Sequence, residues 1–146
     1  MVLIPVMQQE DAMGFLYVTR STSLARWASD VGLGRHVYKI GITEADPKTA
    51  AAQGWAGESD WTIVRKRAVE DLTEEEVVAR LAQKEKMVDP DLYPKLKGAT
   101  GVFRLTVPRV ENHLLVSRAL AGAGGPAEIK LKHGDFADYL IHNALR

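Results

Sequence analysis

Two segments in the first third of the chain combine aromatic and β-branched residues with nearby turn-forming positions. They cover residues 14–19 and 36–43. Side chains of these types favour a pleated, half-buried strand. Because consecutive elements joined by a compact connection usually lie side by side, we expect two adjacent, antiparallel strands.

The same pattern continues further along the chain. Residues 61–67 predict a third strand and residues 101–107 a fourth, and residues 129–131 are a candidate edge strand. These strands are short and separated by helical patterns. They predict a small, mostly antiparallel sheet.

Helix-start signals separate the predicted strands. Ser21 to Ser23 offer a cap for a short helix from Leu24, and Asp46-Pro47 combines a capping aspartate with proline at the first helical position. Helices are also expected at residues 110–121 and after Asp135. One of the helices should therefore begin at Asp46 and pack across the first two strands.

The clearest helix starts with a capping box at Thr73 and is predicted to reach about Val88. Apolar residues recur along it at helical spacing, which predicts one buried stripe. The residues expected inside are Val77, Val78, Leu81 and Val88.

Alternating strands and helices over 146 residues predict an α+β fold in a single domain, with a small sheet flanked by helices. The strand pattern is concentrated in a core of about residues 12–107. The remaining residues, about 108–146, are expected to form a C-terminal helical extension.

Composition narrows the chemistry. The chain has no cysteine, so disulfides, thiolate catalysis and cysteine-bound zinc are excluded. Its formal net charge is zero, which argues against a strong non-specific polyanion binder but leaves room for a local basic patch. The apolar start at residues 1–7 is short and lacks a basic region, so we expect neither a signal peptide nor a membrane span, and a cytoplasmic protein.

Two motifs carry a family resemblance. Gly14-Phe15-Leu16-Tyr17-Val18 and Tyr38-Lys39-Ile40-Gly41-Ile42-Thr43 resemble the two-strand signature of the GIY-YIG superfamily. The second motif is closest to the phage and mobile-element branch, which has Lys-Ile-Gly there. The resemblance covers the first two-thirds of the chain. It implies a nuclease that hydrolyses phosphodiester bonds in DNA with one catalytic metal, Mg²⁺.

The resemblance also implies roles for individual residues. Tyr17 matches the first-motif tyrosine that helps to activate the attacking water, and Lys39 takes the place of the second. Tyr38 falls on the opposite face of the sheet. From its own position, His36 could reach a phosphate or a proton at the start of the second strand. Gly41 indicates a bulge or a close backbone approach inside a strand.

The family implies a glutamate on a later helix as the metal ligand. Glu85 lies on the apolar stripe, where a carboxylate is costly unless it is paired or coordinated. Glu74 lies there too, but the helix dipole and solvent account for a first-turn glutamate. We therefore take Glu85 as the candidate Mg²⁺ ligand; the alternative is a rim glutamate paired with a lysine or arginine.

A nucleic-acid surface is predicted from basic residues next to an aromatic one. The alternative is that nearby acidic residues offset these charges and that the tryptophans belong to the core. The candidates for contact with DNA are Arg35, Lys48, Arg65, Arg67 and Trp55.

Two functions remain open. The first is a metal-dependent endonuclease acting on DNA. The second is a catalytically inactive module of the same fold that binds nucleic acid or a protein partner. The family's helix arginine falls near Ala50 and is missing, and Gly101 stands where relatives often carry an acidic residue; both favour the second function. An arginine from Arg20, Arg35 or Arg104 would restore the first.

Overall fold

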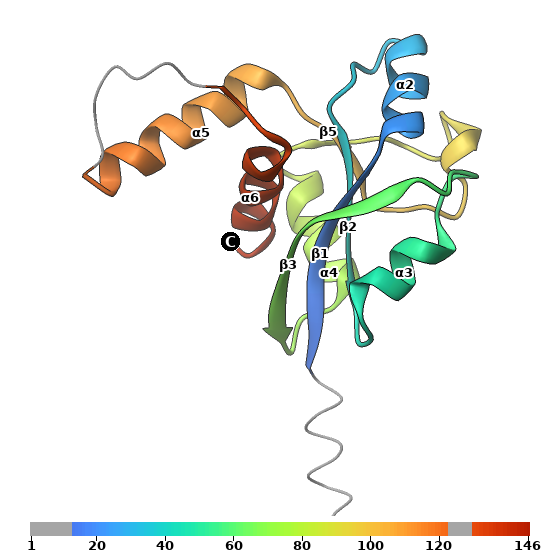
Figure 1. The fold of residues 1–146 in the computed structure, drawn as a ribbon, viewed down its shortest axis with the longest axis horizontal. Helices are drawn as coiled ribbons and strands as arrows, with labels where there is room; N and C mark the ends of the chain where they lie inside the picture. Colours follow the sequence, from blue (N-terminus) through green and yellow to red (C-terminus); the bar gives the residue numbers. More distant parts are fainter. Residues whose placement is uncertain (1–12, 123–129) are drawn as a thin grey trace, which may run out of the picture.

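The computed structural model describes residues 13–122 and 130–146. Five antiparallel strands form one sheet in the order β3-β1-β2-β5-β4, with helices on both faces (Figure 1). This confirms the predicted α+β class. The strands are β1 (Met13–Ser21), β2 (Val37–Thr43), β3 (Trp61–Glu70), β4 (Lys86–Met87) and β5 (Val102–Arg104).

The expected pairing of the first two strands is confirmed. β1 and β2 are antiparallel neighbours, with Tyr17 opposite Gly41 and Thr19 opposite Lys39. β3 pairs with the other edge of β1, and the register shifts between Val18 and Thr19. The two motif strands therefore lie at the centre of the sheet, where their register is fixed from both sides.

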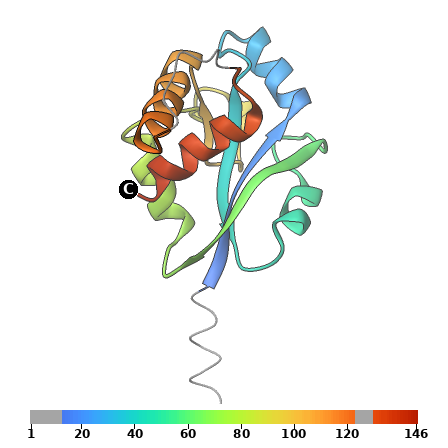
Figure 2. The same ribbon diagram turned by 60° about the vertical axis from the view of Figure 1, so that its left-hand side comes forward.

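Helices cover the two faces of the sheet separately (Figure 2). α2 and α3 lie on one face, and α4 and α6 on the other, with α5 alongside α6. No helix in the described part of the chain is long and apolar enough to cross a membrane. The bounds are α2 (Thr22–Asp30), α3 (Pro47–Gln53), α4 (Glu74–Ala82), α5 (Val107–Leu120) and α6 (His133–Ala144), with a 3₁₀ turn at Pro94–Leu96.

Each face has its own hydrophobic core. Leu24, Trp61 and Leu96 belong to the cluster under α2 and α3. Leu81 and Phe103 belong to the cluster under α4 and α6. Because side chains alternate along a strand, β1 and β2 send every second residue to each core.

Both helices on the α3 face, α2 and α3, begin at the caps predicted from the sequence. The Ser21 hydroxyl accepts a hydrogen bond from the Leu24 backbone N–H at 3.0 Å. Asp46 accepts one from the Lys48 N–H at 3.0 Å, with Pro47 as the first helical residue. α3 then packs over β3 and β1. The expected helix start at Asp46 is confirmed, but α3 packs over β1 and β3 and not across both motif strands as expected.

Several element ends differ from the prediction. α4 stops at Ala82 instead of about Val88, because Lys86–Met87 pairs with β5. The fourth strand covers only Val102–Arg104, and α5 begins at Val107 with Pro108 in its first turn. Lys130 and Leu131 belong to no strand, and residue 129 lies outside the described residues.

The inward stripe of α4 gives a direct test of the packing. Leu81 is completely buried in the core under α4 and α6. Replacing it with alanine removes buried methyl groups and leaves a cavity, so we expect Leu81→Ala to lower the free energy of unfolding by about 2–5 kcal/mol. Urea denaturation measures this; a loss below about 1 kcal/mol would mean that the stripe is not packed as described.

Tyr38 gives a test through pH. Its hydroxyl lies 2.9 Å from Nδ1 of His133, and burial raises the pKa of Tyr38 from 10.0 to about 12. As the pH rises, the unfolded chain loses this proton first. The resulting stability is therefore complete below about pH 10 and lost towards about pH 12. We expect Tyr38→Phe to flatten the fall in unfolding free energy across this window, measured by urea denaturation. Equal slopes would contradict this.

Candidate functional site at the edge of β2

Tyr17 and Lys39 lie on the α3 face of the sheet, beside one tryptophan. The Tyr17 ring stacks on Trp55 with centroids 5.8 Å apart. The Lys39 ammonium lies 4.8 Å from the centroid of the same Trp55 ring and donates a hydrogen bond to the Thr100 carbonyl at 2.9 Å. The structure therefore brings together the two residues that the motifs single out.

The edge of β2 opens next to this pair. The chain bends sharply into β5 at Gly101, which has φ +83° and whose carbonyl accepts the Ile40 N–H at 2.9 Å. An alanine Cβ at Gly101 would meet the Ile40 carbonyl oxygen at 2.6 Å, so this sharp bend requires glycine. β2 thus continues to Thr43 without β5 beside it.

Glu74 occupies the opened edge. Its Oε1 accepts the backbone N–H of Ile42 at 2.9 Å, in place of the carbonyl that a neighbouring strand would supply. Glu74 is the first residue of α4, and Thr73 caps that helix by accepting the Glu76 N–H at 3.2 Å. The cap therefore fixes the helix end that carries this carboxylate.

Gly41 allows the tyrosine and the glutamate to approach each other. A Cβ at this position would lie under 3.0 Å from both the Tyr17 hydroxyl and Glu74 Oε1. These two oxygens therefore flank the space that a side chain would fill. We call Tyr17, Lys39, Gly41 and Glu74 the Tyr17 site.

Burial sets the protonation of the site. It raises the pKa of the Tyr17 hydroxyl above its ordinary value, and the negative charge of Glu74 adds to the shift. Burial lowers the pKa of Lys39, and Glu74 acts in the opposite direction. Tyr17 is therefore a neutral hydroxyl near neutral pH, able to donate or accept a hydrogen bond but not to act as a phenolate base.

An acidic indentation of about 460 Å³ adjoins Glu74, and Glu44 and Asp71 also line it. Among residues 13–122 and 130–146, no group of three or more His, Asp or Glu side chains is arranged to share a metal ion. Mg²⁺ needs only one or two carboxylates when water and phosphate oxygens complete its shell. Glu74 fits that donor set, and Glu44 and Asp71 add a favourable field.

Glu85, the residue chosen from the sequence as metal ligand, is not brought to this site. It follows the C-terminal end of α4, whereas Glu74 begins that helix. The Tyr139 hydroxyl donates a hydrogen bond to Glu85 Oε2, and Arg109 Nη2 lies 3.3 Å from the same oxygen. Glu85 is thus a buried carboxylate paired with Arg109, as in the alternative of a glutamate paired with a lysine or arginine.

His36 and Arg35 are also separate from Tyr17. The His36 ring stacks on Phe136 of α6 with centroids 4.6 Å apart, on the face opposite Tyr17. Burial lowers the pKa of His36, and the charges of Arg35, His133 and Arg20 lower it further. This histidine is positioned by α6 and does not reach the Tyr17 hydroxyl.

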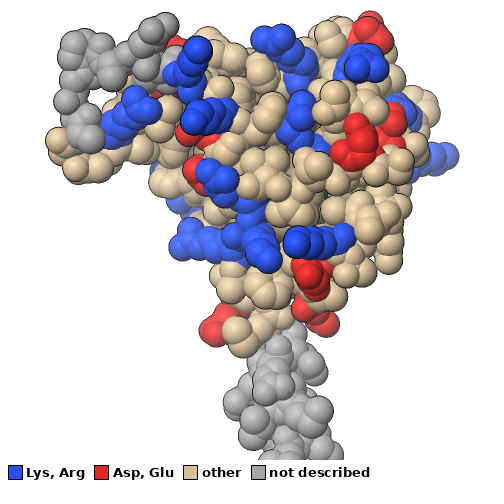
Figure 3. Space-filling view, in the orientation of Figure 1, with Lys and Arg blue, Asp and Glu red and all other residues tan. Residues whose placement is uncertain are grey.

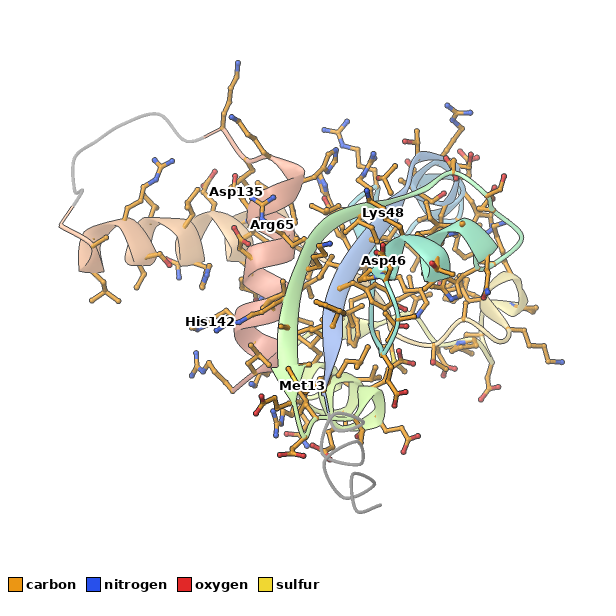
Figure 4. The ribbon with its side chains drawn as sticks, turned by 60° about the horizontal axis from the view of Figure 1, so that its bottom comes forward. Met13, Asp46, Lys48, Arg65, Asp135 and His142 are labelled. Atoms are coloured by element: carbon orange, nitrogen blue, oxygen red, sulfur yellow. The ribbon has the colours of Figure 1, made fainter. Side chains whose placement is uncertain are left out.

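The residues expected to contact nucleic acid fall on different parts of the surface. Lys48 is exposed at the start of α3, whereas Arg65 belongs to β3 and lies near the start of α6 (Figure 4). Arg65 forms an ion pair with Asp138 at 3.2 Å, and Arg67 is exposed on the same strand. Trp55 packs within the Tyr17 site. Figure 3 shows lysine and arginine side chains spread across the face that carries β3 and α6.

Glu74 is the site residue that sequence reasoning set aside. Its signal was present, because it shares the helical stripe of Val77, Val78 and Leu81. The helix dipole offered a sufficient explanation for an acidic first turn, and three consecutive glutamates share that turn. In the structure, Glu74 differs from Glu75 and Glu76 because it accepts the Ile42 N–H at the part of the β2 edge that β5 does not cover.

Comparison of the chain with models of protein families, with curated proteins and with solved structures finds no match. The chemistry of the site is therefore inferred from its own residues.

The close approach at Gly41 can be tested by adding one methyl group. In Gly41→Ala, the new Cβ must displace the Tyr17 hydroxyl and the Glu74 carboxylate, so we expect a loss of about 1–3 kcal/mol in unfolding free energy. Gly14→Ala is the matched control. Its Cβ would meet its nearest atom, the Thr43 carbonyl oxygen, at 3.1 Å, whereas the contacts at Gly41 are shorter than 3.0 Å. Urea denaturation of both variants is the measurement. An equal or larger cost at Gly14 would contradict the close approach.

Proposed function

We propose that this protein is a divergent GIY-YIG-like endonuclease that hydrolyses phosphodiester bonds in DNA with one Mg²⁺. The supporting observation is that Tyr17 and Glu74 converge at Gly41, with Lys39 and Tyr17 against the same Trp55 ring. A hydroxyl, an ammonium and a carboxylate then lie beside one another at an open strand edge. These groups suit an in-line attack of water on phosphorus.

The two motif residues take different roles in this proposal. Tyr17 holds the attacking water by a hydrogen bond, because its raised pKa keeps the hydroxyl neutral. Lys39 contributes positive charge close to a phosphoryl oxygen. Its buried position strengthens that interaction relative to an exposed lysine. Trp55 holds both side chains in place through its ring.

Glu74 would hold the Mg²⁺. When bound, the ion supplies Lewis-acid stabilisation of the charge on the phosphoryl oxygens and lowers the pKa of a water molecule. Glu74 Oε1 is already fixed by the Ile42 N–H, so the carboxylate is oriented before any ligand arrives. A preorganised ligand of this kind costs little reorganisation during the reaction.

The second candidate is a DNA-binding or protein-binding module without catalysis. It is favoured by the charges at the site. Within the described residues, no arginine forms a hydrogen bond or ion pair with Tyr17, Lys39 or Glu74. By strand register, the basic residue that could replace the missing arginine is Lys66, which lies opposite Tyr17 on β3. A lysine cannot reproduce the bidentate contact of an arginine with a phosphate.

Cleavage of single-stranded, duplex and branched DNA with Mg²⁺ or Mn²⁺ separates the two candidates. We expect Glu74→Gln to lower the cleavage rate by at least about 10²-fold, because it removes the charge that would hold the metal. Glutamine keeps an oxygen for the Ile42 N–H, so folding should be retained. We expect a similar loss for Tyr17→Phe.

Glu75→Gln is the matched control, because it removes an exposed carboxylate from the same helical turn. It should leave cleavage unchanged. Mn²⁺ binding, followed by calorimetry, gives a second readout that Glu74→Gln should weaken. Absence of metal-dependent cleavage of every DNA form by the unmodified protein would rule out the endonuclease and leave the binding module.

A further inference from the structure

A second cluster of functional side chains lies at the other end of the sheet from Glu74. A pocket of about 500 Å³ opens between α2 and the start of α6. Figure 2 shows these two helices towards the same end of the sheet. The charged and imidazole side chains that line it are Arg20, Arg26, Asp30, Arg35, His36 and His133. We call it the arginine pocket.

The pocket carries a positive excess, because three guanidinium groups face one carboxylate. Among the described residues, the one side-chain hydrogen bond from these arginines is that of Arg20 Nη1 to the Thr22 hydroxyl, at 3.2 Å. Arg26 and Arg35 have no hydrogen bond or ion pair in that part of the chain. Their donors are therefore available to an anion from solvent.

Two imidazoles complete the wall of the pocket. The His36 ring is held against Phe136, and His133 Nδ1 lies 2.9 Å from the buried Tyr38 hydroxyl. Where Tyr38 donates to Nδ1, the proton of a neutral His133 is on Nε2, which then becomes a donor. Burial lowers the pKa of both histidines, and Arg20 lowers both further. Arg20 and both histidines line the same pocket, so they face one volume that a ligand could occupy.

The start of α6 adds to the positive field. His133 is the first residue of this 12-residue helix, and backbone N–H groups at a helix start favour an anion. The next residue, Gly134, packs directly against the Arg65 guanidinium, which would overlap a Cβ there. Beyond Asp135 and Asp138 of α6, Arg65 and Arg67 on β3 extend the positive side chains of this surface, and Arg65 is paired with Asp138. A surface of this kind suits a chain of phosphates more than one isolated anion.

We propose that the arginine pocket is a phosphate-binding site that receives a phosphate group of a nucleic-acid strand. It is separate from the Tyr17 site and does not depend on catalysis there. Arginine is suited to this role because its planar fork binds phosphate oxygens in pairs. Arg65 and Arg67 would then hold neighbouring phosphates of the same strand.

The first test is a titration of the full chain with inorganic phosphate at constant ionic strength, observed through the NMR signals of His36 and His133. We expect a saturable shift of both. Arg35→Gln should weaken the binding by about tenfold or more, because one charge-assisted contact is lost. Arg35 is exposed in the loop before β2, so this change should not affect folding. Arg118→Gln, an exposed arginine on α5, is the matched control.

The second test uses oligonucleotides of one sequence with either a 5′-phosphate or a 5′-hydroxyl. Tighter binding of the phosphorylated form assigns the pocket to a strand end, and equal binding assigns it to backbone phosphates. Either result supports the proposal if Arg20→Gln and Arg35→Gln lower the affinity for the oligonucleotide and Arg118→Gln does not. The proposal is overturned if phosphate gives no saturable shift. It is also overturned if the pocket variants bind oligonucleotides as tightly as the unmodified protein.

These outcomes are independent of the Tyr17 site. Glu74→Gln should leave phosphate binding in the arginine pocket unchanged, because Glu74 does not line that pocket. Loss of cleavage with intact phosphate binding would leave this proposal in place. Loss of phosphate binding in Glu74→Gln would contradict the separation of the two sites.

Discussion

The open edge of β2 beyond Ile40 is the constraint on which the candidate site depends. β5 begins only after Gly101, so the Ile42 N–H has no strand neighbour on this side and would otherwise lack a partner. A backbone donor in this position needs an acceptor. Glu74 supplies it and thereby fixes a carboxylate beside Gly41. One missing strand neighbour thus becomes the reason why an acidic group lies close to Tyr17.

The two faces of the sheet differ in how their buried charged groups are paired. The α4 and α6 face holds the larger apolar core, and its buried carboxylate, Glu85, is neutralised by Arg109 and bound by Tyr139. The α3 face buries Lys39 among an aromatic ring and a carbonyl, without an ion pair in the described residues. Buried polar groups usually need full pairing. The face with the less completely paired charge is the one that suits chemistry.

Zero net charge conceals an uneven distribution. Acidic side chains line the indentation next to Glu74, whereas arginines line the pocket at the other end of the sheet and continue along β3. The first region favours a cation and the second favours an anion. The metal ion and the phosphate chain that we propose as ligands would need both regions, and total charge reveals neither region.

The sequence by itself determined the α+β class, the pairing of the motif strands and the helix that begins at Asp46. These features follow from local propensities, caps and short connections, which act within a few residues. The family resemblance implied that Tyr17 and Lys39 share a face, and the register of β1 and β2 in the structure agrees with this. Which of Glu74 and Glu85 lies beside Tyr17 was decided only by tertiary structure. It depends on where β5 begins and on partners from α5 and α6, and these contacts join residues far apart in the chain.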